Sequence, residues 1–246
     1  MKKNSFFIIL FLFFANFIMA QNKIIYFYDG NNPKDSEKLL FRLQKDSVYN
    51  FLEFENLKFI KLESDSIEFP EEICLLKNLE VIHIVGKGID KIPANIKTLP
   101  NLKRIIFQNS NINEIPLCLQ NVEQLIFRSC KIKSVPDYII KFENLKVLSF
   151  NLCPIIHISS KLGCVSTLEQ LSFYKCFLNE LPENIGELPR LERLNLENNN
   201  LKKLPLSVID NPNIKEINIL WNNFSKREVK KIKKKMKNTK FEADYD

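Results

Sequence analysis

The sequence predicts an α/β solenoid, a right-handed coil of short repeats with a parallel β-sheet on its concave side. The first observation is a repeat of 23 residues: Leu145-Lys-Val-Leu-Ser-Phe150 returns as Leu168-Glu-Gln-Leu-Ser-Phe173 and again as Leu191-Glu-Arg-Leu-Asn-Leu196. The second is that apolar and polar residues alternate in these segments, which is the period of a strand with one buried face. One such repeat cannot bury its apolar residues alone, but stacked repeats can.

The same pattern extends in both directions and gives eight repeats, which start at residues 57, 79, 102, 122, 145, 168, 191 and 214. Five of the seven intervals are 23 residues, and the others are 22 and 20. In the 20-residue repeat, every apolar position keeps its register as far as Leu119, at repeat position 18. The deletion is therefore expected after that position, on the convex side, without displacement of the strand at 102–107.

Each repeat has further apolar positions that close the coil. Position 11 is apolar, and position 14 is apolar and usually followed by proline, which fixes φ and donates no hydrogen bond. Positions 18 and 21 are apolar and should seal the convex side. The prolines that mark the return path are Pro93, Pro116, Pro136, Pro182 and Pro205.

This repeat resembles the leucine-rich-repeat family in its 23-residue form, L-x-x-L-x-L-x-x-N-x-L-x-x-L-P, of an exported bacterial type. The segment from Leu191 through Asn199 to Pro205 matches the pattern at every signature position. The resemblance covers residues 57–224 and implies a horseshoe with a parallel concave sheet, an irregular or helical-turn convex side and a helical C-terminal cap. A helical-repeat array is the structural alternative, but it would not preserve the alternation of a strand.

Position 9 departs from the plain pattern. Its residues are Asp65, Lys87, Ser110, Cys130, Cys153, Cys176, Asn199 and Asn222. In the family this side chain points inward and satisfies backbone groups of the loop, and cysteine is a known substitute for asparagine there.

The cysteines predict no cofactor or metal site. Cys130, Cys153 and Cys176 lie 23 residues apart. Parallel side chains on neighbouring coils have the wrong geometry for a disulfide, so we expect a buried ladder of thiols. A metal site is the alternative, but three thiols in line are not a tetrahedral cage. For Cys74, Cys118 and Cys164, which fall on return segments, the sequence leaves burial open.

The first 20 residues have the pattern of a secretory signal peptide. Lys2 and Lys3 precede an apolar run from Phe6 to Ala15, and Ala20 offers a small residue before a cut at Gln21. A membrane anchor is the alternative, but the run is shorter than the ~20 residues that a bilayer requires. The mature chain is therefore expected to be exported, to the periplasm, the cell surface or the medium.

The flanks of the repeats are expected to cap them. In the N-terminal capping segment, 21–56, residues 24–28 suggest a strand and 35–44 a helix that buries Leu39, Leu40 and Leu43. In the C-terminal segment, 225–246, Ser225-Lys-Arg-Glu228 has the capping-box spacing of a helix start. That helix would bury Val229, Ile232 and Met236 and present a basic face, which is either a solvated cap or a contact for an acidic surface such as anionic lipid.

The net charge of +7 does not indicate nucleic acid as a partner. Lys2 and Lys3 contribute +2, and residues 226–246, with nine Lys or Arg and four Asp or Glu, contribute +5, so residues 4–225 are neutral overall. His83 and His157 are the two histidines, and neither has a Ser-His-Asp or Cys-His spacing around it. The sequence shows no catalytic constellation.

These observations favour a monomeric, non-enzymatic binding module whose concave sheet contacts a protein or glycan. The alternatives are a structural component of the cell envelope without a discrete ligand and, less favoured, an enzyme with residues on the concave face. Strand positions 3, 5, 7 and 8 should face outward, and several are apolar where water is expected, which often marks an interaction site. The plain alternative is that β-branched residues favour strands. The candidate partner-binding residues are Val81, Val85, Arg104, Ile106, Ile126, Arg128, Val147, Leu152 and Tyr174.

Overall fold

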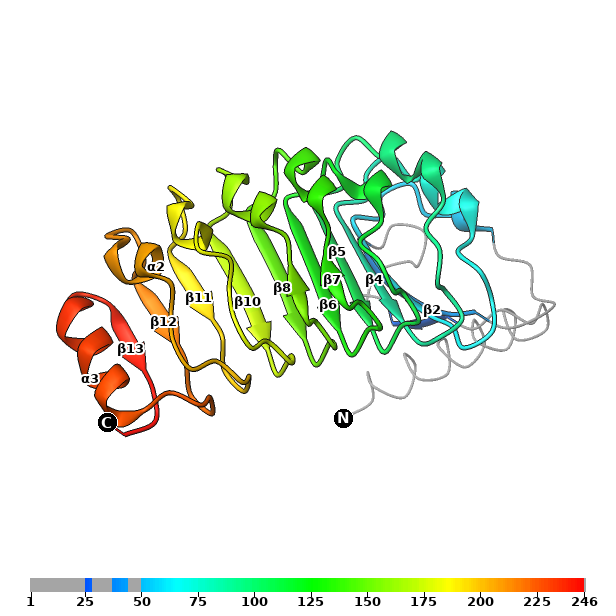
Figure 1. Cartoon of the computed structure of the whole chain (residues 1–246). Coiled ribbons are helices and arrows are strands. Elements are labelled where there is room, and N and C mark those ends of the chain that lie inside the picture. The colour runs from blue at the N-terminus through cyan, green and yellow to red at the C-terminus, as the bar shows by residue number, and fades with distance from the viewer. Residues whose placement is uncertain (1–24, 28–36, 44–49, 246) are drawn as a thin grey trace, which may run out of the picture.

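The computed structural model describes residues 25–27, 37–43 and 50–245. Its strands stack side by side in one open sheet, with short helices along the opposite side of the coil and α3 (Lys226–Lys235) covering the C-terminal end (Figure 1). The predicted signal peptide, 1–20, lies outside the described residues.

Ten strands of the sheet run parallel, in the order of the chain. They are β2 (Lys38–Arg42), β3 (Phe59–Glu63), β4 (Val81–Val85), β5 (Arg104–Gln108), β6 (Gln124–Arg128), β8 (Val147–Asn151), β10 (Gln170–Tyr174), β11 (Arg193–Asn195), β12 (Glu216–Asn218) and β13 (Lys240–Glu242). The eight strands from β3 to β12 each begin two residues after a predicted repeat start. The α/β solenoid with a parallel concave sheet, as found in leucine-rich repeats, is therefore the fold of this chain.

The short return segments contain seven 3-10 helices and one helical turn, α2 (Leu206–Asp210), among the described residues. The 3-10 helices cover Phe51–Glu53, Glu71–Leu75, Ala94–Thr98, Leu117–Leu119, Asp137–Lys141, Ser160–Cys164 and Ile185–Glu187. Two short strands outside the main sheet, β7 (Ser134–Val135) and β9 (His157–Ile158), pair with each other in parallel.

The 20-residue repeat is shortened where the sequence predicted. Strand β5 pairs in register with both β4 and β6, so the strand is not displaced. The 3-10 helix that follows it, Leu117–Leu119, has three residues, whereas the helices of the repeats before and after it have five. The missing residues are therefore taken from the end of the convex segment.

The N-terminal end corrects one prediction. Residues 38–42, expected to be helical, form the strand β2, which pairs with β3 in parallel and with β1 (Ile25–Phe27) in antiparallel orientation. Leu39 and Leu43 are buried as expected, but Leu40 is only half-buried and Phe41 is buried instead, because a strand alternates its faces. The edge of β3 offers unpaired backbone groups, and β2 satisfies them.

The core is a set of columns, each made of one repeat position. Position 6 gives a column of four phenylalanines, Phe107, Phe127, Phe150 and Phe173, with ring centroids 5.2, 5.2 and 5.5 Å apart and nearly parallel planes. All four side chains are fully buried.

The position-9 ladder lies inside this core, as predicted. Cys130, Cys153 and Cys176 are buried free thiols, and the Sγ of each lies 3.6–3.7 Å from the position-6 carbonyl oxygen of the preceding coil. Asn199 donates from Nδ2 to the equivalent carbonyl, of Phe173, at 2.6 Å and accepts from the backbone N–H of Leu178 at 3.1 Å. The asparagines thus bond to two backbone groups of the neighbouring coil, whereas the cysteines reach one.

In the coils from β4 to β13, the turn that leaves the strand contains a residue in the left-handed conformation. Position 8 has a positive φ in eight coils, at Gly86, Asn109, Ser129, Leu152, Lys175, Asn198, Trp221 and Tyr245. In the first of these a side chain is excluded as well, because a Cβ on Gly86 would lie 2.3 Å from the carbonyl oxygen of Ser64. Position 8 therefore turns away from the sheet.

Candidate functional site

The concave sheet carries a groove of about 380 Å³ that crosses the middle and C-terminal strands from β6 to β12. Its side chains come from positions 3, 5 and 7, which alternate with the buried positions 4 and 6. The outward-facing residues that line it are Ile126, Arg128, Val147, Ser149, Asn151, Gln170, Ser172, Arg193, Asn195, Glu216 and Asn218.

The groove has one apolar and one polar part. Ile126 and Val147 are half-buried and form its apolar end. The polar floor is held in place by hydrogen bonds between neighbouring coils: Asn151 accepts from Ser172 at 3.4 Å, and Asn218 donates to Glu197 at 2.7 Å. Such a floor presents hydroxyl and amide groups on rigid strands, which suits recognition of backbone or hydroxyl groups of a ligand.

Two arginines line the groove, Arg128 and Arg193, and they differ in their partners. The Arg128 side chain is exposed, and no ion pair or side-chain hydrogen bond of its guanidinium occurs within the described part of the chain. Arg193, by contrast, lies 3.8 Å from the carboxylate of Glu216. Arg128 is therefore free to contact an acidic group of a ligand.

The structure places most of the predicted partner-binding residues on the concave face, but only three of them line the groove. Ile126, Arg128 and Val147 do so. Val81 and Val85 lie on β4, Arg104 and Ile106 on β5, and Tyr174 on β10, all half-buried and outside the groove lining. Ile106 and Ile126 are register partners on neighbouring strands, as expected from their shared column.

The prediction that Leu152 lies on the concave sheet is wrong. Position 8 was expected to face outward from the sheet, but β8 ends at Asn151 and Leu152 adopts φ 57° in the turn that follows. It lines a separate depression with Pro154, Lys175 and Phe177. The alternation rule fails there because it holds only while the backbone stays extended.

His83 also lies in the concave column next to Ile106, and it is half-buried rather than exposed. Its Nε2 lies 3.1 Å from Oε1 of Gln108. Burial lowers the pKa of His83, and the hydrogen bond to Gln108 opposes that shift. This histidine is packed on the sheet surface and hydrogen-bonded to Gln108.

The hydroxyl and amide residues of the groove floor were missed by the sequence analysis. Ser149, Asn151, Gln170 and Asn195 occupy the same outward positions as the apolar residues that were selected. A polar residue on a solvated strand face is ordinary, so the sequence carried no signal that would single them out.

Solved structures that are similar to this chain include leucine-rich-repeat proteins. A leucine-rich-repeat protein of Leptospira interrogans superposes with a TM-score of 0.60 at 24% identity, over 78% of this chain and 56% of that protein. The ectodomain of the Arabidopsis thaliana receptor kinase GASSHO1/SCHENGEN3, in complex with Casparian strip integrity factor 2, gives 0.52 at 23% identity, over 70% and 22%. The plant peptide hormone receptor RGFR1, in complex with RGF2, gives a TM-score of 0.51 at 20% identity, over 69% of this chain and 33% of that protein.

These likenesses show the fold. The chain spans only about half the length of the Leptospira protein and less of the plant receptors. No family profile matches the chain, and no curated protein matches it. In the described residues, no helix is long and apolar enough to span a membrane, and no three His, Cys, Asp or Glu side chains are grouped to hold a metal ion.

Proposed function

We propose that this chain is an exported, non-enzymatic binding module that holds a segment of a partner protein in the concave groove between β6 and β12. The observation that carries the proposal is the groove itself, in which an apolar end, a hydroxyl and amide floor and the free Arg128 meet on rigid strands. Ligand sites commonly combine an apolar wall with a few fixed polar groups.

A protein segment fits this groove better than a small molecule. The groove is open and crosses five strands, so a ligand would lie across the repeats and contact several coils. One plant receptor with this fold was solved in complex with Casparian strip integrity factor 2, and a plant peptide hormone receptor was solved in complex with RGF2, which supports a protein or peptide partner here. A glycan would use the same hydroxyl and amide groups and is the alternative ligand.

A site-specific crosslink tests the proposal in producing cells. A photoreactive phenylalanine analogue at Ser172, on the groove floor, should give a covalent adduct with a protein, and mass spectrometry of the adduct identifies the partner. The matched control is Leu117, which is 41% exposed on a 3-10 helix away from the groove. An adduct at Leu117 but not at Ser172 would contradict the proposal.

A second variant separates the groove from the rest of the concave face. Ile126→Asp places a charge at the apolar end and should reduce the Ser172 adduct about fivefold or more, since loss of a buried anchor removes over 1 kcal/mol. Ile106→Asp, in the same column but outside the groove lining, should have a smaller effect. Thermal melting of both variants checks that the fold is kept.

Export is a separate part of the proposal, supported by the sequence of residues 1–20. The intact mass of the protein recovered outside the cytoplasm should correspond to a chain that begins at Gln21. A mass that includes residues 1–20 would overturn signal-peptide removal and favour anchoring, without affecting the groove.

A further inference from the structure

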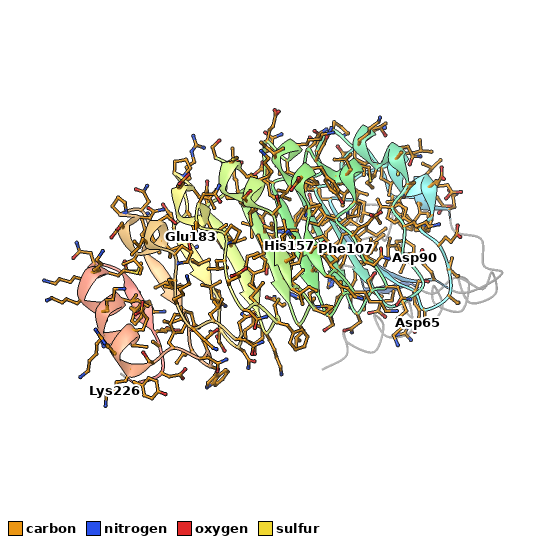
Figure 2. The ribbon with its side chains drawn as sticks, in the orientation of Figure 1. Asp65, Asp90, Phe107, His157, Glu183 and Lys226 are labelled. Atoms are coloured by element: carbon orange, nitrogen blue, oxygen red, sulfur yellow. The ribbon has the colours of Figure 1, made fainter. Side chains whose placement is uncertain are left out.

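We propose that one edge of the solenoid docks on an anionic lipid bilayer. This edge is formed by the loops that follow the strands, at repeat positions 8 to 13, and we call its C-terminal half, residues 129–134, 152–157, 175–180, 198–203 and 221–226, the docking edge. The loops lie along the lower side of Figure 1, and Figure 2 labels Asp65 and Lys226 near the two ends of that side. The inference does not rest on the concave groove.

The docking edge carries large apolar side chains that the fold does not bury. Leu152 is 47% exposed, Ile156 64%, Phe177 58% and Trp221 59%, and Tyr245, in the next turn along, is 60% exposed. Leu152, Pro154 and Phe177 share a depression of about 320 Å³ with the side chain of Lys175. None of the exposed large apolar side chains of the described structure lies in the N-terminal half of this edge.

Two of these exposed apolar residues also have an unfavourable backbone conformation. Leu152 and Trp221 hold left-handed conformations, with φ of 57° and 54°. Bulky residues rarely adopt this conformation, and the other coils place Gly, Asn, Ser, Lys175 or Tyr245 there. Each of these turns thus keeps a large apolar side chain at its tip although a smaller residue would fit with less strain.

The two halves of this edge differ in charge: the C-terminal half is rich in lysine, and the N-terminal half contains more carboxylates. In the C-terminal half Lys131, Lys133, Lys175, Lys202, Lys203 and Lys226 are exposed, against a single carboxylate, Glu180. In the next turn along, that of Tyr245, the carboxylate of Asp244 accepts from the backbone N–H of Trp221 at 2.9 Å. None of these six ammonium groups has an ion-pair partner in the part of the chain that the structure describes. In the N-terminal half the corresponding loops hold Asp65, Glu68, Asp90 and Glu114 against Lys87 and Lys91.

The lysines of the opposite edge behave differently. At repeat position 2, lysines are paired with glutamates of the preceding coil: Lys58 with Glu37 at 2.6 Å, Lys103 with Glu80 at 3.5 Å, Lys146 with Glu123 at 2.8 Å, and Lys215 with Glu192. The position-2 lysines on one edge are therefore paired with glutamates of neighbouring coils, whereas the six lysines of the docking edge are unpaired within the described residues.

Apolar side chains, an exposed Trp and Tyr, and free lysines in one row have the composition of a protein surface that lies in the bilayer interface. The row extends from the coil of β6 to that of β13, about 24 Å at the ~4.8 Å spacing of neighbouring strands. Its apolar side chains are spread over several coils, and only Leu152 and Phe177 of them share a depression, so they match a flat surface better than a folded partner. Helix α3 adds charge alone, because Val229, Ile232 and Met236 are buried.

The test uses the protein as the cell produces it, with vesicles of phosphatidylcholine alone or with phosphatidylglycerol, at low ionic strength. Trp221 is the only tryptophan of the chain, so its fluorescence reports on the docking edge directly. We expect co-sedimentation and a blue shift of the Trp221 emission with phosphatidylglycerol and neither with phosphatidylcholine alone.

Matched variants locate the charge. Lys131→Gln, Lys175→Gln and Lys202→Gln together should lower the partition coefficient roughly 100-fold, since each lysine near an anionic surface contributes about fivefold. Lys103→Gln, Lys146→Gln and Lys215→Gln remove the same charge from the paired edge and should change it only a few-fold. Phe177→Ser should lower it about tenfold through lost apolar contact.

Three results would overturn the proposal. The first is absence of binding to phosphatidylglycerol vesicles, in which case an acidic protein is the partner that fits these cations. The second is an equal loss in both lysine variants, which would show that net charge alone acts. The third is co-sedimentation without a change in Trp221 emission, which would place the contact elsewhere, such as at the N-terminal segment.

Discussion

At the scale of single residues, asparagine and cysteine at repeat position 9 both contact backbone groups of the preceding coil, but the asparagine makes the stronger hydrogen bonds. Asn199 bonds to both a carbonyl and an N–H of the preceding coil, at 2.6 and 3.1 Å. Cys176 offers only a thiol, 3.6 Å from the carbonyl of Phe150, and a thiol is a weak donor. Burial raises the pKa of Cys176 to about 12, so it stays neutral in the core.

This difference predicts unequal losses of stability. Asn199→Ala leaves buried carbonyl and N–H groups without partners and should lower the free energy of unfolding by about 1–3 kcal/mol. Cys176→Ala removes a small apolar group with a weak hydrogen bond and should lower it by less, about 1 kcal/mol. Urea unfolding of the two variants measures both values. Equal losses would mean that the asparagine bonds contribute nothing beyond packing.

At the scale of elements, the phenylalanine column links four strands through one repeat position. The rings of Phe107, Phe127, Phe150 and Phe173 stack at 5.2–5.5 Å, close to the spacing of the strands that carry them. The column ends at Leu196, which occupies position 6 of the next coil and is also fully buried. The position therefore accepts either side chain where the neighbouring coils allow it.

Truncation of a phenylalanine inside the column should remove packing contacts with both neighbouring coils. Phe150→Ala should lower the free energy of unfolding by about 3–5 kcal/mol, because it leaves a cavity between Phe127 and Phe173. Phe150→Leu is the matched control, with an expected loss of about 1.5 kcal/mol or less. Thermal unfolding followed by circular dichroism compares the two. A Phe150→Ala variant as stable as Phe150→Leu would show that the coils collapse freely around the site.

At the scale of the whole molecule, the open stack leaves core residues at its ends that need a cover. Ser225 caps α3 by accepting from the N–H of Glu228 at 3.2 Å, and α3 then buries Val229, Ile232 and Met236 over the last coil. After α3 the chain returns to add β13 beside β12. The C-terminal cap is therefore a helix followed by one more strand.

Removal of residues 225–246 should expose Ile217, Ile219 and Phe224, all buried now. Burial of each large apolar side chain contributes about 1.5–3 kcal/mol, so the shortened chain should melt at a lower temperature and associate. Lys230→Gln with Lys234→Gln is the control, because it changes charge and keeps the apolar cover. Light scattering and thermal melting compare the three proteins, and a shortened chain that stays monomeric with an unchanged melting temperature would contradict the capping role.

The sequence by itself determined the repeat, its register and hence the sheet. Each strand from β3 to β12 begins two residues after a predicted repeat start, and Cys130, Cys153 and Cys176 are buried as their spacing indicated. The physical reason is that a stacked repeat places the same position of every coil in one column, so a period in the sequence directly reports neighbours in space.

Only the tertiary structure decided what happens where that periodicity ends. Residues 38–42 form a strand instead of a helix because β3 presents an open edge, and β13 forms beside β12 for the same reason. Leu152 left the sheet because its backbone turns left-handed, a feature that depends on the loop. The groove and the docking edge likewise combine side chains from different coils. The sequence of one repeat does not show that these side chains lie close together.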